Sequence, residues 1–113
     1  AGVLAYLSFR PDCVCFRANS GAVRFGKAFV KFGIKGQSDI ICIQAPTGRF
    51  IGIETKREVG GVLSPDQKQW GEMIEAHGGK YIVASDVDDV IVGLGDPQVQ
   101  VFKKSWRRID YPR

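Results

Sequence analysis

The stretches Gly36-Gln37-Ser38-Asp39-Ile40 and Gly52-Ile53-Glu54-Thr55-Lys56 decide the fold of this chain. A Thr-Gly turn lies between them, so we expect the two segments to pair as a β-hairpin. Side chains two apart in a strand share a face, which places Glu54 and Lys56 on the same side. Asp39 lies near the same end of the expected hairpin. Two carboxylates and one ammonium group are therefore predicted to converge on a small site.

The predicted pair of carboxylates requires a partner that offsets its repulsion. Two carboxylates about 4 Å apart repel by about 4 kcal/mol at an effective dielectric constant of about 20. A divalent cation removes this repulsion, and Mg²⁺ favours one or two carboxylates together with waters and substrate phosphates. A nearby lysine can hold a phosphate oxygen or orient an attacking water, which suits phosphodiester hydrolysis. The alternative is a Glu54–Lys56 ion pair of little energetic weight, because Glu-x-Lys is a common tripeptide.

The composition is typical of a folded protein. Hydrophobic residues make up 44% of the 113 residues, enough for one domain with a modest core, which we assign to residues 1–113. No apolar stretch approaches the roughly 20 residues that span a bilayer. The apolar segment at residues 1–7 has no basic residue before it, so a helix or strand is favoured over a signal peptide. Because the first residue is not Met, we expect the natural chain to begin upstream of Ala1.

Charge is distributed unevenly along the chain. Residues 1–38 hold six Lys/Arg and one acid, residues 39–96 hold five Lys/Arg and ten acids, and residues 97–113 hold five Lys/Arg and one acid. Basic ends around an acidic middle fit a polyanion-binding surface that surrounds a metal site. The alternative is an ordinary solvated surface, because blocks of this size also occur in other domains.

The three cysteines, Cys13, Cys15 and Cys42, do not indicate a disulfide framework, because their number is odd. Cys13 and Cys15 also lack partners at zinc-finger spacing. We expect all three to be reduced packing residues in an intracellular protein, in the cytoplasm of a bacterium or of a phage-infected host.

Local signals predict alternating strands and helices. Ser64 and Gln67 form a predicted capping box, Pro65 suits the first helical position, and Gly78 is expected to end that helix. A second helix is expected to be capped by Ser85 and to run through residue 94. The expected strands are residues 14–18, 24–32, 40–45, 50–56 and 80–84, with a helix at residues 2–9 and a last strand or basic arm at residues 99–106.

Three motifs in this order resemble the virus-type replication-repair nuclease (VRR-NUC) domain of the PD-(D/E)XK nuclease superfamily. They are Gly-x-Ser-Asp at residues 36–39, Ile-Glu-Thr-Lys at residues 53–56 and Leu-Ser-Pro-Asp-Gln-Lys-Gln-Trp at residues 63–70. The Arg-Ala-Asn-Ser-Gly segment at residues 17–21 and the Gly-Gly pair at residues 78–79 also resemble that domain. The resemblance runs over about residues 16–90, and the motifs are specific as an ordered set.

The resemblance implies an α/β fold of the restriction-endonuclease type, with a central mixed β-sheet flanked by helices. It implies that Asp39, Glu54 and the backbone carbonyl of Thr55 bind Mg²⁺ or Mn²⁺. Lys56 would orient the attacking water or stabilise charge on the phosphate, as a catalytic residue beside the two acids. Gln67 would be a further catalytic residue, near the lysine or a phosphate, although helix capping explains this glutamine equally well.

One feature departs from the superfamily pattern. Many members carry another acid on a helix near the N-terminus, where it assists metal binding. Before Asp39 this chain has only Asp12, which follows Pro11 outside the predicted helix. Either the additional acid lies upstream of Ala1, or this member works without it.

DNA is the expected partner, because basic side chains flank the proposed centre. Trp106 could stack on bases, or this region could form an edge or dimer contact with solvated charges. The candidate phosphate contacts are Arg17, Arg24, Lys103, Lys104, Arg107 and Arg108.

The sequence therefore predicts a metal-dependent DNA endonuclease. Small stand-alone members of the superfamily resemble Holliday-junction resolvases, which implies a homodimer that cleaves branched DNA in replication, recombination or repair. One alternative is a non-catalytic DNA-binding module on the same fold. A second is a small structural partner in a replication or packaging complex, which would have no affinity for DNA.

Overall fold

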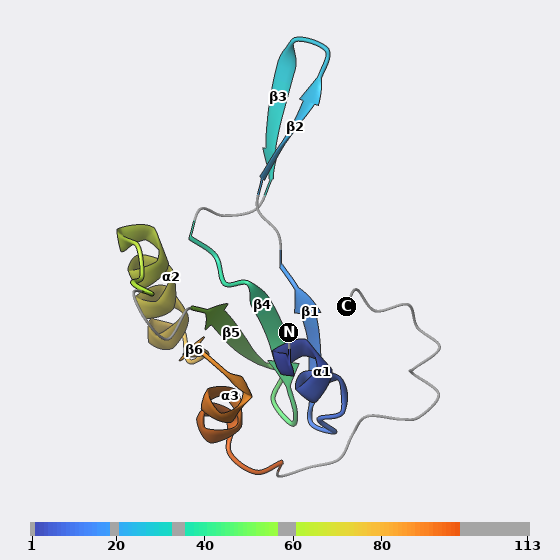
Figure 1. The fold of residues 1–113 in the computed structure, drawn as a ribbon, viewed down its shortest axis with the longest axis vertical. Helices are drawn as coiled ribbons and strands as arrows, with labels where there is room; N and C mark the ends of the chain where they lie inside the picture. The colour runs from blue at the N-terminus through green and yellow to red at the C-terminus, as the bar shows by residue number, and fades with distance from the viewer. Residues whose placement is uncertain (1, 19–20, 33–35, 57–60, 98–113) are drawn as a thin grey trace.

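The computed structural model describes residues 2–18, 21–32, 36–56 and 61–97 (Figure 1). The elements in these ranges are α1 (Gly2–Ser8), β1 (Cys13–Arg17), β2 (Gly21–Phe25), β3 (Ala28–Phe32), β4 (Ile40–Gln44), β5 (Arg49–Thr55), α2 (Pro65–Ala76), β6 (Lys80–Ala84) and α3 (Val87–Leu94). The predicted basic arm at residues 99–106 lies outside the described residues.

A four-stranded mixed sheet forms the centre of the fold, with strand order β1-β4-β5-β6. β1 and β5 both pair antiparallel with β4, whereas β6 pairs parallel with β5. The predicted hairpin is present, and its register pairs Ile40 with Ile53. The α/β class and the mixed sheet expected from the sequence are thus confirmed.

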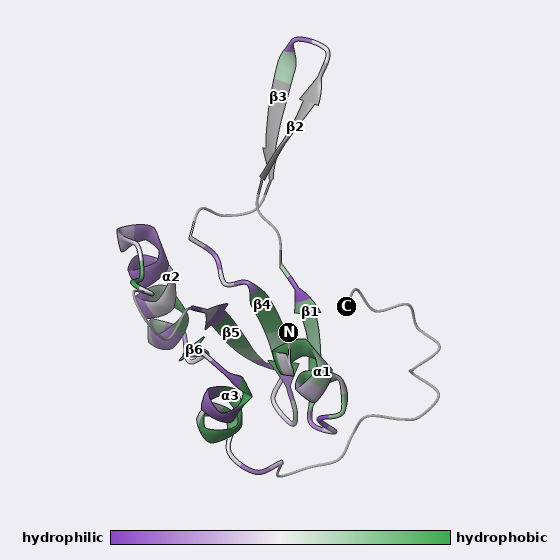
Figure 2. Ribbon diagram, in the orientation of Figure 1, coloured by the Kyte–Doolittle hydropathy of each residue, from purple (hydrophilic) through white to green (hydrophobic). Residues whose placement is uncertain are grey.

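The two faces of the sheet are covered by different helices. Side chains that alternate along β5 point to opposite faces. Ile51 and Ile53 belong to the main core, to which α1 and α3 contribute Val3, Leu7 and Val90. On the other face, α2 lies against β5 and β6. Figure 2 shows hydrophobic residues on the strands of this sheet and on α1 and α3.

Close approach of α2 explains a glycine in β5. A Cβ atom at Gly52 would collide with Ser38 and would come within 2.9 Å of Ile74 Cδ1. Ser38 has no exposed surface, so it cannot move outward into solvent. The absence of a side chain at residue 52 therefore lets the loop before β4 and helix α2 lie close to the sheet.

The prediction of one strand over residues 24–32 is wrong. β2 and β3 form a separate hairpin, with Phe25 paired to Ala28 and a two-residue loop of Gly26 and Lys27. Gly26 has a φ of 59°, which glycine adopts without a steric penalty and which the first loop position of such a hairpin requires. The hairpin projects away from the four-stranded sheet (Figure 1).

The predicted N-cap residue is confirmed for α2 and is wrong for α3. Ser64 caps α2 as predicted, and Gly78 follows its last turn with a φ of 88°. The cap of α3 is Asp86 rather than Ser85, because the Asp86 carboxylate accepts the Asp89 N–H at 3.0 Å. The Ser85 N–H instead donates to the Asp89 carboxylate at 2.8 Å.

The three cysteines were predicted to be reduced packing residues. Cys13, Cys15 and Cys42 are free thiols, and Cys13 and Cys42 are buried, so their predicted packing role is confirmed.

Among the described residues, every helix falls short of the length and apolar character needed to cross a membrane.

Candidate active site

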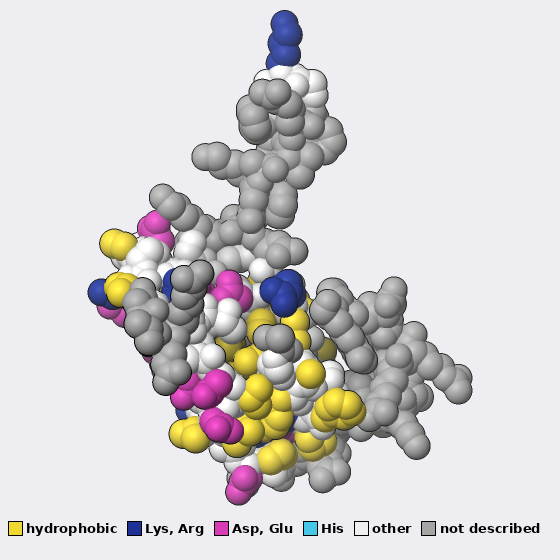
Figure 3. Space-filling view, viewed as in Figure 1, with side chains coloured by type: hydrophobic (Ala, Val, Ile, Leu, Met, Phe, Trp, Pro, Cys, Tyr) yellow, Lys and Arg dark blue, Asp and Glu magenta, His cyan; other side chains and the backbone are white. Residues whose placement is uncertain are grey.

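The acidic residues of the two motifs meet at one end of the sheet. Asp39 immediately precedes β4, and Glu54 and Thr55 end β5. Because β4 and β5 are antiparallel, the start of one strand lies beside the end of the other. In Figure 3, acidic and basic side chains lie near each other at this end of the sheet, below the β2–β3 hairpin. The predicted convergence of the two stretches is therefore present.

Asp39 is held by groups on β5. Its Oδ2 atom accepts hydrogen bonds from the backbone N–H of Thr55 at 2.9 Å and from the Thr55 hydroxyl at 2.8 Å. Its carbonyl accepts the Ala18 N–H at 2.8 Å, which ties the same residue to the end of β1. The carboxylate is thus fixed at the edge of the β-hairpin, within electrostatic reach of Glu54.

Glu54 is a buried acid with one unsatisfied oxygen. Its side chain is 3% exposed. Its Oε1 atom accepts a hydrogen bond from Gln67 Nε2 and lies 3.9 Å from Lys56 Nζ. Its Oε2 atom is buried and has no hydrogen-bond partner among the described residues. An unpaired buried carboxylate oxygen is costly, so this atom is the most unusual polar group at the site.

Burial raises the pKa of Glu54 to about 7, and the negative charge of Asp39 adds to this rise. The Lys56 ammonium acts in the opposite direction. In the metal-free protein Glu54 therefore changes its protonation state near neutral pH. A shift of this kind, caused by burial and by a second carboxylate, is typical of functional sites.

Lys56 shares a face with Glu54, as the spacing predicted. Its backbone N–H donates to the Ala84 carbonyl at 2.9 Å, which fixes the chain just beyond β5. Its side chain is 23% exposed, whereas the Glu54 side chain is buried. The ammonium group can thus contact both the buried carboxylate and a ligand that approaches from solvent. The same-face ion pair considered as the alternative is present, with one buried partner and one partly exposed partner.

Gln67 caps α2, as one of the two predicted roles requires, and its side-chain amide also contacts Glu54, which the sequence did not predict. Its Oε1 atom accepts the Ser64 N–H at 2.9 Å, which completes the capping box of α2. Its Nε2 atom donates to Glu54 Oε1. One amide therefore joins the first turn of α2 to the buried carboxylate.

Arg17 is the one predicted phosphate contact whose side chain the structure describes. It is exposed at the end of β1 and lines a cavity of about 180 Å³ together with Asp39 and Thr55. Arg24 belongs to β2, on the projecting hairpin, and its side chain is not among those described. The remaining candidates lie outside the described residues: Lys103, Lys104, Arg107 and Arg108.

Asp12 does not contribute to the carboxylate cluster. It is buried at the other end of the sheet, where its carbonyl accepts the Ala45 N–H after β4. Its carboxylate lies 2.6 Å from Arg10 Nε and also accepts a hydrogen bond from Gln44. Among the described residues, no group of three or more His, Cys, Asp or Glu side chains could hold a metal.

The sequence did not predict two features near the site, which are the hydrogen bond of Trp70 to Ser38 and the buried hydroxyl of Tyr81. Trp70 Nε1 donates to Ser38 Oγ at 2.8 Å, which anchors the residue before Asp39 to α2. The hydroxyl of Tyr81, on β6, is buried without a hydrogen-bond partner among the described residues, and the charges of Glu54 and Asp39 act on it. The only sequence signal for Tyr81 was an aromatic residue in a strand beside a motif strand.

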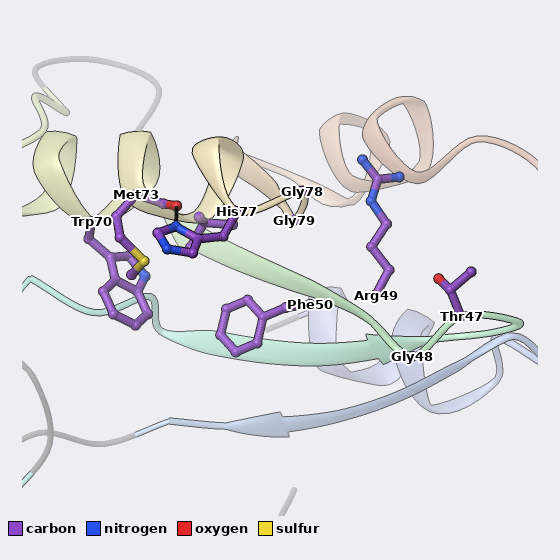
Figure 4. Close-up of a pocket in the computed structure, with 10 residues that line it drawn as sticks. Thr47, Gly48, Arg49, Phe50, Trp70, Met73, His77, Gly78 and Gly79 are labelled. Atoms are coloured by element: carbon purple, nitrogen blue, oxygen red, sulfur yellow. Dashed lines mark hydrogen bonds between the residues drawn. The ribbon is translucent and has the colours of Figure 1, made fainter.

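A larger cavity of about 560 Å³ lies between the β4–β5 hairpin and the second half of α2 (Figure 4). Phe50 and Trp70 meet there edge to face, with ring centroids 6.3 Å apart. Met73 lies on the same side, and Arg49 and His77 supply the ionisable groups. The described lining of this cavity contains no acidic side chain, so the cavity is separate from the cluster of Asp39 and Glu54.

The comparisons with known proteins agree with the motifs. A family model described as the VRR-NUC domain matches residues 15–87, a range that contains Asp39, Glu54, Lys56 and Gln67. Comparison with curated proteins and with solved structures found no match. Because the family model matches well over half of the 113 residues, the chain belongs to the VRR-NUC domain family of nucleases.

Proposed function

We propose that this domain hydrolyses phosphodiester bonds of DNA with a divalent cation held by Asp39 and Glu54. The observation that carries the proposal is the buried Oε2 atom of Glu54, which has no partner among the described residues and lies within electrostatic reach of Asp39. A cation would offset the negative charge that the two carboxylates retain beside the single ammonium group of Lys56. Mg²⁺ and Mn²⁺ suit a site with two acidic ligands, because they retain waters and bind substrate phosphates.

The backbone carbonyl of Thr55 fits as a third ligand. In an extended strand, the N–H and the carbonyl of one residue point to the same edge. The Thr55 N–H donates to Asp39, whereas the N–H of the next residue, Lys56, donates to β6. The Thr55 carbonyl is therefore directed towards the Asp39 side of β5. This geometry supports a ligand set of Asp39, Glu54 and the Thr55 carbonyl.

The bound cation would polarise the phosphate and lower the pKa of an attacking water. The chain's own residues would position these groups. Lys56 reaches from the buried Glu54 towards solvent, where its ammonium can hold a phosphate oxygen or orient the water. Gln67 keeps Glu54 in one orientation through its hydrogen bond to Oε1. This arrangement leaves Oε2 for the cation.

The β2–β3 hairpin supports DNA as the substrate. Residues 21–32 contain Arg24, Lys27 and Lys31 and no acid. A two-stranded ribbon of this size can enter the major groove of DNA, and basic residues on it would contact phosphates. Arg17 lies at the end of the preceding strand, beside the carboxylate site. The hairpin would thus guide a duplex towards Asp39 and Glu54. We include the basic residues 103, 104, 107 and 108 in the proposed DNA surface.

We further propose that the protein acts as a homodimer on branched DNA. Two copies related by a two-fold axis would present two cleavage sites, as cutting both strands of a junction requires. Support comes from the family alone. The non-catalytic DNA-binding module is the alternative that the experiment must exclude.

The test is cleavage of a four-way junction, a flap and a plain duplex in Mg²⁺, Mn²⁺ or EDTA. Lys56→Ala removes the proposed catalytic ammonium, and Lys68→Ala removes an exposed lysine of α2 as a matched control. We expect metal-dependent products from the wild type and from Lys68→Ala but not from Lys56→Ala. Faster cutting of the junction would support the resolvase role. DNA binding without cutting in either metal would instead favour the non-catalytic module.

A further inference from the structure

Two buried side-chain atoms in the described residues have no hydrogen-bond partner: Glu54 Oε2 and the Tyr81 hydroxyl. They lie on neighbouring strands, because β5 and β6 pair in parallel with Gly52 opposite Tyr81 and Glu54 opposite Val83. Residues two apart in a strand share a face, so Tyr81 and Glu54 both face α2. A buried acceptor and a buried donor are thus both unsatisfied beneath one helix, and each alone is costly.

Helix α2 fixes the position of both side chains. The Tyr81 ring lies so close to Gly71 that a Cβ atom there would come within 2.5 Å of Cδ2. Gln67 lies one turn earlier on the same helix and holds Glu54 Oε1. The Tyr81 N–H donates to the Glu75 carboxylate of α2 at 3.0 Å, which anchors the strand as well. The hydroxyl therefore has little freedom to find another partner.

The charge state of Tyr81 makes it a donor. Burial, followed by the charges of Glu54 and Asp39, raises the pKa of Tyr81 to about 12. The hydroxyl thus keeps its proton at neutral pH, and both carboxylates act on it. A carboxylate oxygen has two lone-pair sites, so Oε2 can accept a hydrogen bond and bind a cation at the same time.

We propose that Tyr81 is a positioning residue, whose hydroxyl donates through one bridging water to Glu54 Oε2. A water between these atoms would satisfy both, as buried waters do for polar groups that cannot meet directly. With Gln67 on Oε1 and Tyr81 on Oε2, the carboxylate is held in the plane that presents Oε2 to the cation. The inference rests on the metal-binding role proposed for Glu54 above.

The test measures Mn²⁺ binding by electron paramagnetic resonance, with the full chain and no DNA. Tyr81→Phe removes only the hydroxyl and keeps the ring against Gly71. Tyr6→Phe is the matched control, because the Tyr6 hydroxyl accepts a hydrogen bond from Arg10 Nη1 at 2.9 Å, away from the carboxylate site. Loss of an outer partner of a metal ligand commonly weakens binding by about 10- to 100-fold.

We expect Tyr81→Phe to weaken Mn²⁺ binding by about 10- to 100-fold. We expect its melting temperature in EDTA to stay close to that of the wild type, and DNA cleavage to recover when Mn²⁺ is raised. Tyr6→Phe should bind Mn²⁺ as the wild type does. Equal Mn²⁺ affinity in Tyr81→Phe and the wild type would overturn the role of Tyr81 alone. A wild type that binds no Mn²⁺ would overturn the proposed function and, with it, this inference.

Discussion

Gln67 donates a hydrogen bond to Glu54 with the same side-chain amide that caps α2. The start of the helix and the orientation of the buried acid are therefore set by one residue. Truncation of Gln67 should affect stability and chemistry together, whereas loss of the cap alone should affect only stability.

Gln67→Ala should lower the free energy of unfolding by about 1 kcal/mol, the usual effect of losing a helix cap. It should also reduce DNA cleavage, because Glu54 loses the hydrogen bond on Oε1. Ser64→Ala is the control, since it removes the other half of the capping box and leaves the Glu54 contact. Urea unfolding measures the loss of stability in the two variants, and cleavage rates measure the loss of activity. Equal losses of cleavage in the two variants would mean that the Glu54 contact has no role in catalysis.

Glu54 should make the metal-free protein less stable as the pH rises. Its pKa is raised from the ordinary 4.5 to about 7, so between these values the folded state retains a proton that the unfolded state releases. The stabilisation from that proton is complete below the lower value and is lost as the pH approaches 7. Thermal unfolding in EDTA from pH 4 to pH 8 measures this loss, and Glu54→Gln should remove that part of the pH dependence.

With Mn²⁺ bound, the protein should gain stability as the pH rises, because a proton on Glu54 competes with the cation. Mn²⁺ affinity is expected to rise as the pH increases through 7, the region in which Glu54 loses its proton. Isothermal titration calorimetry at several pH values measures the effect. An affinity that stays constant from pH 6 to pH 8 would argue against Glu54 as a ligand.

Asp39→Asn should remain folded and lose activity. An asparagine side-chain oxygen can still accept the hydrogen bonds that Thr55 donates to Asp39, but it lacks the charge for a cation. We expect cleavage to fall at least about 100-fold, in line with the loss of a charged catalytic group. Thr55→Val is the control, since it removes the hydroxyl and keeps the backbone carbonyl. A severe loss of cleavage in Thr55→Val would show that the hydroxyl bond to Asp39 is itself required for activity.

The basic hairpin should contribute to DNA affinity through phosphate contacts. Each lost contact lowers the slope of log K against log salt concentration by about 0.9. Arg24→Ala and Lys27→Ala are each expected to show this reduction in fluorescence anisotropy titrations between 50 and 200 mM salt. Lys68→Ala on α2 should leave the slope unchanged. A slope that is the same in all variants would place the DNA elsewhere on the protein.

The parts of the fold predicted correctly are those with strong local signals. The β4–β5 hairpin follows from its Thr-Gly turn, and α2 follows from Ser64, Pro65 and Gln67. The β2–β3 hairpin was missed because the apolar spacing of residues 24–32 continues through Gly26. Whether that glycine turns the chain depends on its positive φ, which the sequence pattern does not reveal.

At the site, too, the features that depend on neighbouring residues could be predicted, whereas those that depend on pairing between distant segments could not. The shared face of Glu54 and Lys56 follows from strand geometry, and the place of Asp39 follows from the hairpin. Tyr81 comes within electrostatic reach of Glu54 and Asp39 only because β6 pairs parallel to β5. That register depends on long-range packing, so the residues of β6 alone could not predict it. The cap of α3 similarly depended on which of two adjacent residues, Ser85 or Asp86, leaves the helical conformation.

The most direct test of the central claim is an anomalous-scattering map of crystals grown with Mn²⁺. We expect one strong peak between a carboxylate oxygen of Asp39 and Glu54 Oε2, next to the Thr55 carbonyl. The peak should disappear in Glu54→Gln crystals and persist in Glu75→Gln crystals. A saturated Mn²⁺ site elsewhere, with none between Asp39 and Glu54, would contradict the account.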